Sequence, residues 1–156
     1  MSIPLAQRAG APEFVPFPGE HHGIEWEPLR ADHHVGLAAL FARMEARDNP
    51  PYRTSADEVE EMLSGASQWR GLVGVARRGI ADGRLVAFAQ VVLRFPGRVE
   101  CVCIGGVDPD FRRIGLGSAI VDWQEGTARQ MLASVEGEGP AQITCNVEAG
   151  QDDLEA

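Results

Sequence analysis

The chain of 156 residues is long enough for one domain with a sizeable core, and its 44% hydrophobic and 24% charged residues are typical of globular proteins. Its formal charge of −9 repels nucleic acid and anionic membranes, so neither is an expected partner. No apolar run approaches the roughly 20 residues of a membrane span, and the N-terminus lacks a signal-peptide pattern. Three cysteines do not suggest a disulfide framework. We therefore expect a cytoplasmic protein.

The first 23 residues contain four prolines and several glycines, without any hydrophobic period. We therefore expect a flexible N-terminal arm over residues 1–23, followed by a single domain over residues 24–156. His21 and His22 are adjacent in this arm, where solvated side chains are more common than metal ligands. No metal site is expected.

Alternation of apolar and polar residues over positions 24–29 predicts a first strand that stops at Pro28. Asp32 can cap a following helix whose apolar residues recur three and four positions apart. Ser55 and Glu58 match a capping box that opens a second helix. The acidic residues of this second helix predict a solvated face, and the alternative is an acidic patch that recruits an amine. They are Asp57, Glu58, Glu60 and Glu61.

Three further strands are predicted over residues 71–76, 85–93 and 99–107, joined as a meander. A helix is predicted from Leu116 and another strand over residues 141–147, and Asp152 or Asp153 looks like the start of one more helix. The predicted order is therefore strand, helix, helix, three strands, helix and strand. This order indicates a domain of the α/β (α+β) class.

The last strand of the meander carries two cysteines and a glutamate. Alternation places Cys101 and Cys103 on one face and Glu100 on the other. The apolar company of the cysteines favours core packing over a nucleophile or a metal ligand. The pair Gly105-Gly106 breaks the alternation and predicts a bulge or a close backbone approach.

The segment after this strand combines one proline, two arginines and two glycines. Pro109 ends strand pairing because it has no N–H group. The first turn of the helix that follows carries unpaired N–H groups and the positive end of the helix dipole, so it attracts anions. Gly115 and Gly117 allow a phosphate to approach the backbone, and Arg112 and Arg113 add positive charge. The segment therefore predicts a strand–loop–helix phosphate cradle.

Two familiar phosphate loops are excluded. A P-loop requires Gly-Lys-Ser/Thr at the helix start, and this segment has no lysine. A dinucleotide-binding loop requires a third glycine, but Gly117 is followed by Ser118, Ala119 and Ile120. The segment resembles the pyrophosphate loop of the GNAT superfamily of acyl-CoA-dependent N-acyltransferases, in which V-x-P precedes [RQ]-x-x-G-x-[GA] at a helix start. Here the pattern reads Val107-Asp108-Pro109 and Arg112-x-x-Gly115-x-Gly117. The alternative is an anion-binding α/β domain unrelated to CoA.

The resemblance covers roughly residues 24–150 and implies a mixed, mostly antiparallel sheet flanked by helices. It also implies acetyl-CoA as co-substrate, with the pantetheine arm on main-chain groups that a bulge at Gly105-Gly106 leaves unpaired. The pyrophosphate would lie on the loop from Arg112 to Ser118. The cofactor-binding residues implied in this way are Gly105, Gly106, Val107, Arg112, Arg113, Ile114, Gly115, Leu116, Gly117 and Ser118.

The members of this superfamily continue with a helix and two closing strands, which usually include a tyrosine that protonates the departing thiolate. This chain stops at Ala156, and its one tyrosine is Tyr52 in the loop before the second predicted helix. We therefore expect part of a longer or tandem protein. A homodimer or a second GNAT domain would complete the sheet.

Candidate general bases are Glu100, beside the predicted bulge, and Glu148, after the last predicted strand. Counting back from Arg112, the position where the superfamily often carries a glutamate falls on Cys101 rather than Glu100. A main-chain N–H near Gly106 or Val107 would stabilise the oxyanion. The resemblance implies an N-acetyltransferase that acts on a primary amine, small molecule or peptide. The alternative is a non-catalytic CoA-binding or structural domain within a larger protein or oligomer.

Overall fold

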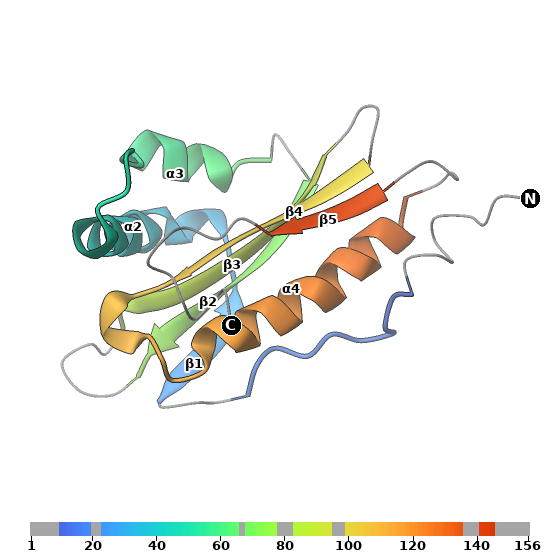
Figure 1. Cartoon of the computed structure of the whole chain (residues 1–156), viewed down its shortest axis with the longest axis horizontal. Coiled ribbons are helices and arrows are strands. Elements are labelled where there is room, and N and C mark those ends of the chain that lie inside the picture. The colour runs from blue at the N-terminus through green and yellow to red at the C-terminus, as the bar shows by residue number, and fades with distance from the viewer. Residues whose placement is uncertain are drawn as a thin grey trace, which may run out of the picture.

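A five-stranded sheet forms the centre of the molecule in the computed structural model (Figure 1), which describes residues 10–19, 23–65, 68–77, 83–94, 99–135 and 141–145. The strands lie side by side in chain order, antiparallel except for the last pair, which is parallel. They are β1 (Ile24–Pro28), β2 (Gln68–Ala76), β3 (Leu85–Arg94), β4 (Val99–Val107) and β5 (Ala141–Cys145).

Helices cover both faces of this sheet, so the described part of the chain forms three layers (Figure 1). The helical segments are η1 (Ala31–His33), α2 (His34–Asp48), α3 (Ala56–Met62), η3 (Pro109–Phe111) and α4 (Leu116–Ala133). One buried cluster lies between the sheet and α4, and a second lies between the sheet and the α2–α3 pair. The expected order of elements and the mixed, mostly antiparallel sheet are confirmed.

The helix starts follow the sequence signals in one case and depart from them in another. At α3, Ser55 Oγ accepts from the Glu58 N–H at 3.1 Å and the Glu58 carboxylate accepts from the Ser55 N–H at 3.3 Å, which confirms the capping box. Asp32 was the expected cap of the preceding helix, and this prediction is wrong. Asp32 lies inside η1, and the N-cap position of α2 is occupied by His33. The Asp32 carboxylate instead pairs with Arg30 at 3.4 Å.

Residues 10–19 have no regular secondary structure, yet they lie along α4 on the outer side of the molecule (Figure 1). Gln130 donates to the carbonyls of Pro12 and Glu13 at 3.1 and 3.3 Å, and Phe17 meets Trp123 edge to face with ring centroids 6.4 Å apart. This part of the expected flexible arm is therefore attached to the domain. His21 and His22 lie outside the described residues.

Gly126 lies inside α4, which continues through it from Leu116 to Ala133. A Cβ at Gly126 would lie 3.0 Å from Val15, so the missing side chain makes room for the N-terminal segment. The glycine therefore serves packing between the segment and α4.

The expected bulge at Gly105-Gly106 does not occur in the pairing of β4 with β3. The register is regular from Ala87 opposite Val107 to Arg94 opposite Glu100. The shift in the sheet lies instead in β2, between Gly74 and Val75. The other alternative for the Gly105-Gly106 pair, a close approach of its backbone to neighbouring groups, agrees with the structure.

Candidate functional site

The connection from β4 to α4 contains two residues in the left-handed region of backbone space. Arg113 has a φ of 66° and Gly115 a φ of 92°, and Gly115 is the N-cap of α4. The first i to i−4 bond of the helix joins the Ala119 N–H to the Gly115 carbonyl at 3.1 Å. Leu116, Gly117 and Ser118 precede this bond, and the cap residue makes no side-chain hydrogen bond. The start of α4 therefore presents backbone N–H groups and the positive end of the helix dipole, without an acidic residue in its first turn.

The end of β4 leads directly into this loop. Residues of an antiparallel ladder direct their backbone groups to alternate edges. The Asp108 N–H bonds Val86 on the β3 side at 2.7 Å, whereas the Val107 carbonyl accepts from Arg112 Nε at 3.1 Å. By the same alternation, the N–H and C=O of Gly105 also face away from β3.

The strand on that far side is β5, which pairs with β4 only as far as Cys103 within the described residues. The pairing runs from Val99 opposite Ala141 to Cys103 opposite Cys145. Beyond it, the backbone groups of Gly105 and Val107 continue the same edge toward the start of α4. The Val107 carbonyl already accepts from Arg112 Nε, whereas the other backbone groups on this edge are of the kind that can hydrogen-bond an extended ligand.

The two glycines of β4 each meet a packed neighbour on opposite faces of the sheet. A Cβ at Gly106 would lie 2.5 Å from Met44 Sδ on the α2 side. A Cβ at Gly105 would lie 3.1 Å from the Phe88 carbonyl and 3.2 Å from Ile120 Cγ2 on the α4 side. The glycines therefore bring α2 and α4 close to the end of β4.

The predicted phosphate loop is only partly directed outward. Arg113, Gly115 and Ser118 are exposed, Ile114 is half-buried, and Leu116 and Gly117 are buried in the first turn of α4. The guanidinium of Arg112 forms a bidentate pair with Asp48 at the end of α2, at 2.6 and 2.7 Å. The motif's first arginine is therefore bound within the protein, and the backbone is the part of the loop best placed for an anion.

Glu100, the predicted base, lies on the same face of the sheet as Ile104, which packs against the α2–α3 cluster. Ile104 lies four positions further along the strand, which is about 13 Å at roughly 3.3 Å per residue. Gln142 donates to the Glu100 carboxylate at 3.0 Å. Glu100 is thus placed early on β4, within the part of the strand that pairs with β5. The other candidate, Glu148, lies outside the described residues.

A hollow of about 440 Å³ lies on the α2–α3 face beside this strand. Ile104 contributes from β4, and the two carboxylates in its lining belong to α3. The acidic face of α3 is exposed, as predicted for a solvated face, and it also borders this hollow. The lining residues are Phe41, Tyr52, Thr54, Glu58, Glu61, Met62 and Ile104.

A larger hollow of about 700 Å³ lies on the other face, between the segment 15–19 and the first half of α4. Trp26 and Trp123 line it together with Gly115 and Ser118. Trp26 Nε1 is buried without a hydrogen-bond partner in the described structure. This hollow adjoins the start of α4 from the β1 side of the helix.

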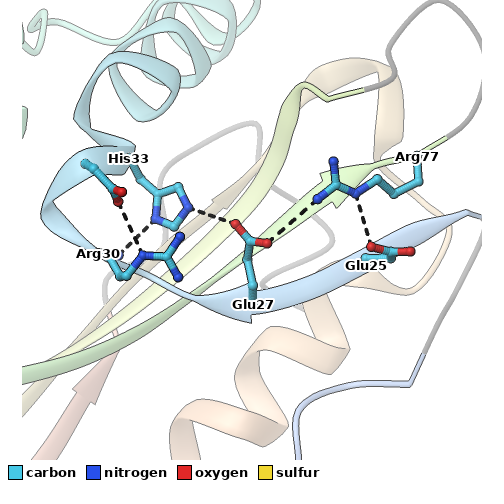
Figure 2. Close-up of polar contacts among 6 residues, drawn as sticks. Glu25, Glu27, Arg30, His33 and Arg77 are labelled. Atoms are coloured by element: carbon cyan, nitrogen blue, oxygen red, sulfur yellow. Dashed lines mark hydrogen bonds and ion pairs between the residues drawn. The ribbon is translucent and has the colours of Figure 1, made fainter.

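His33 lies beside β1, the first strand in the sheet order (Figure 2). His33 Nδ1 accepts from the Arg30 N–H, so Nε2 carries the hydrogen that binds Glu27 at 2.9 Å. Arg77, the residue after β2, pairs with Glu25 and Glu27 at 3.1 and 3.8 Å. These contacts join β1 to its neighbours, three strands away from β4.

The cysteines of β4 are buried on the α4 face, as the alternation predicted. Burial raises the pKa of the Cys101 thiol to about 11, and the thiol donates to the Ala128 carbonyl at 3.7 Å. A protonated, enclosed thiol is a poor nucleophile. Among the described residues, no group of three His, Cys, Asp or Glu side chains could hold a metal ion. None of the helices described is long and apolar enough to cross a membrane.

Sequence reasoning missed Asp48 and Arg43, which bind the loop from α2. Arg43 Nε bonds Asp108 Oδ2 at 2.6 Å, and Asp108 is only 1% exposed. Arg43 is 65 positions from its partner in the sequence, and Asp48 is 64 positions from its partner. A polar residue on an amphipathic helix is ordinarily solvated, so a single sequence offered no signal for these pairs.

No protein-family model matches the chain, and no curated protein sequence matches it. Solved structures do match. A ribosomal-protein-alanine N-acetyltransferase from Brucella melitensis biovar Abortus 2308 is 19% identical with a TM-score of 0.58, over 86% of this chain and 87% of that one. A predicted acetyltransferase with acetyl-CoA from Clostridium acetobutylicum is 10% identical with a TM-score of 0.62, over 84% and 85% of the two chains.

A GCN5-related N-acetyltransferase from Sphaerobacter thermophilus is 23% identical with a TM-score of 0.62, over 86% of this chain but 41% of its own length. At these identities the similarity establishes the arrangement of the backbone. The sheet order, the β4–α4 junction and these neighbours agree. The chain therefore has the fold of the GCN5-related N-acetyltransferases, the GNAT superfamily.

Proposed function

We propose that the protein is an N-acetyltransferase that moves an acetyl group from acetyl-CoA to a primary amine. The observation that carries this proposal is the continuity between the outward backbone groups of Gly105 and Val107 and the uncapped start of α4. An acyl-CoA is a ligand with two matching parts, an amide-containing extended arm and a diphosphate. The neighbours that share the fold include a protein with acetyl-CoA and one with CoA.

The diphosphate would lie on the backbone of the loop and the first turn of α4. Gly115 has no Cβ and a φ of 92°, so its backbone can approach an anion closely. Consecutive left-handed and helical residues direct N–H groups toward one side, which is the geometry of an anion nest. The exposed Arg113 adds charge to the same loop. Residues Arg112 to Ser118 remain the proposed phosphate loop, with Arg112 in a supporting position.

The pantetheine arm would pair with the edge of β4 at Gly105 and Val107. Its amides match the N–H and C=O of Gly105, because the Val107 carbonyl already accepts from Arg112 Nε. Of the two predicted oxyanion donors, the Gly106 N–H faces β3 by the alternation along β4. The Val107 N–H faces the ligand edge and would donate to the developing oxyanion. In the transfer, the acceptor nitrogen forms a bond to the acetyl carbon while the carbon–sulfur bond breaks. The nitrogen loses one proton and the CoA sulfur gains one.

The acceptor would enter from the α2–α3 face. The hollow of about 440 Å³ reaches Ile104, one residue before Gly105, and its two carboxylates favour a cationic group over an anionic one. An amine that arrives protonated suits such a wall. Glu58 and Glu61 therefore give the proposed amine acceptor a place beside the proposed thioester.

A second candidate function is a domain that binds CoA without catalysis. The placement of Glu100 favours it, because its carboxylate accepts from Gln142 and lies about 13 Å along the strand from Ile104. A base at that distance would need a chain of water molecules to reach the acceptor. Both candidates share the same CoA site.

The experiment that separates them measures thiol release from acetyl-CoA with a panel of primary amines. We expect turnover with at least one amine, and Glu100→Gln shows whether that carboxylate takes part. Binding of CoA without turnover on any amine would favour the non-catalytic domain. Absence of CoA binding at millimolar concentration would contradict both. A cytoplasmic location, and a second copy or second GNAT domain as partner, belong to the same proposal.

A further inference from the structure

Two ion pairs join α2 to the β4–α4 connection, and α2 provides the cation in one pair and the anion in the other. α2 provides Arg43 to the carboxylate of Asp108, and Asp48 to the guanidinium of Arg112. The pair Asp48–Arg112 is bidentate, at 2.6 and 2.7 Å, and both side chains are largely buried, at 8% and 13% exposed. Figure 1 shows the end of α2 beside this connection.

Arg112 joins three parts of the molecule through one planar group. Its Nε donates to the Val107 carbonyl at the end of β4, while its two terminal nitrogens bind Asp48 at the end of α2. Its own backbone is the first residue of the predicted phosphate loop. Such a fork fixes orientation as well as distance, because both N–H···O bonds must be made at once. The position of Asp48 in the last turn of a helix also places the cation near the negative end of the α2 dipole.

The second pair fixes the point where the chain leaves β4. Arg43 Nη2 also donates to the Leu85 carbonyl at 2.6 Å, so the guanidinium bridges the start of β3 and Asp108. Asp108 Oδ1 accepts from the Asp110 N–H at 2.9 Å and thereby shapes η3. The loop is thus held at its entry by Arg43 and at Arg112 by Asp48, both from the same helix.

We propose that Arg112 acts as a positioning residue for the phosphate loop, and that Asp48, outside the motif, is a determinant of CoA affinity. This inference rests on the proposed function for its ligand. The competing role for Arg112 is direct charge contact with the diphosphate, which the sequence pattern suggests. The two roles make opposite demands on Asp48. If Arg112 positions the loop, Asp48 supports binding; if Arg112 contacts phosphate, Asp48 competes for its charge.

Asp48→Asn separates the two roles because it keeps the shape of the side chain and removes the charge. We expect it to weaken CoA binding by roughly tenfold or more, since small misplacements of a binding loop have large effects. Arg112→Gln is expected to weaken binding similarly. The double variant is expected to be no weaker than the worse single variant, because both changes remove one interaction. Calorimetry with CoA gives these affinities.

The matched control is Glu25→Gln, which removes a carboxylate from the Arg77 pair at the β1 edge (Figure 2). It is expected to leave CoA affinity unchanged. A second variant, Arg112→Lys, retains the positive charge but cannot make both bonds to Asp48 at once. We expect it to bind CoA as weakly as Arg112→Gln. It also serves if Asp48→Asn fails to fold.

Backbone ¹⁵N order parameters of residues 113–118, measured on the ligand-free protein, provide a readout that needs no CoA. We expect them to fall in Asp48→Asn and to be unchanged in Glu25→Gln. The inference is overturned if Asp48→Asn binds CoA as well as or better than wild type while Arg112→Gln binds it weakly. It is equally overturned if the loop order parameters do not change. If wild type binds no CoA, the proposed function fails, and the order parameters alone decide whether Asp48 positions the loop.

Discussion

Gly115 has a φ of 92°, a conformation that an L-residue adopts only under strain. Substitution by alanine leaves two outcomes: the residue keeps this φ, or the loop relaxes and moves its N–H groups. The strain of a left-handed L-residue is about 1–2 kcal/mol. The free energy of unfolding of Gly115→Ala should therefore fall by about that amount in chemical denaturation.

The effect on CoA should be larger than the effect on stability alone explains. A hydrogen bond to a charged group contributes about 1.5–3 kcal/mol, so losing one backbone contact to the diphosphate weakens binding by roughly ten- to a hundredfold. Calorimetry with CoA, well below the unfolding temperature of the variant, measures this change directly.

Gly83→Ala is a matched control for this substitution. Gly83 has a φ of 84° in the connection before β3, and a Cβ there would meet nothing within 4 Å. Its stability should fall by a similar amount, while its CoA affinity should equal that of wild type. Equal CoA affinity in Gly115→Ala and Gly83→Ala would refute the assignment of Gly115 to the phosphate site.

Two further predictions concern the core. Burial raises the pKa of Cys101 from 9.0 to about 11, so the folded state favours the protonated thiol. The contribution of this group to the free energy of unfolding is fully present below pH 9, and about 3 kcal/mol of it is lost as the pH rises through 11. Denaturation of wild type and Cys101→Ala across that pH range checks this loss. In Gly71→Ala, the new Cβ would lie 2.7 Å from Leu29 and 2.8 Å from the Ala89 carbonyl, so the free energy of unfolding should fall by about 1–3 kcal/mol. The control Gly65→Ala, whose Cβ would meet nothing within 4 Å, should change the free energy of unfolding little. Equal free energies of unfolding for the two variants would contradict the packing at Gly71.

Much of the fold was predictable because local signals and burial agree. The bounds Val99–Val107 of β4 match the expectation, and the alternation along it places Cys101 and Cys103 against α4. The start of β2 was missed by three residues, at Gln68 rather than position 71. Gln68 and Arg70 are exposed, so the pairing with β3, rather than a hydrophobic pattern, extends that strand.

The candidate site was predictable in its backbone and less so in its side chains. Glycine and proline impose local geometry, so the sequence located the turn at Pro109 and the start of α4. The Gly105-Gly106 pair was predicted to mark a bulge or a close backbone approach, and the structure shows the second, with Met44 and Ile120 close to the two glycines. The partner of Arg112 depends on the packing of α2 against β4, a long-range contact that no local pattern encodes.

The most direct test of the central claim is a titration of ¹⁵N-labelled protein with CoA, followed by backbone amide shifts. The account predicts that the largest shifts occur at Gly105, Val107 and residues 113–118, the edge of β4 and the start of α4. Saturable shifts confined to other residues, such as the β1 edge around Glu27, would contradict it. No shift at millimolar CoA would contradict it as well.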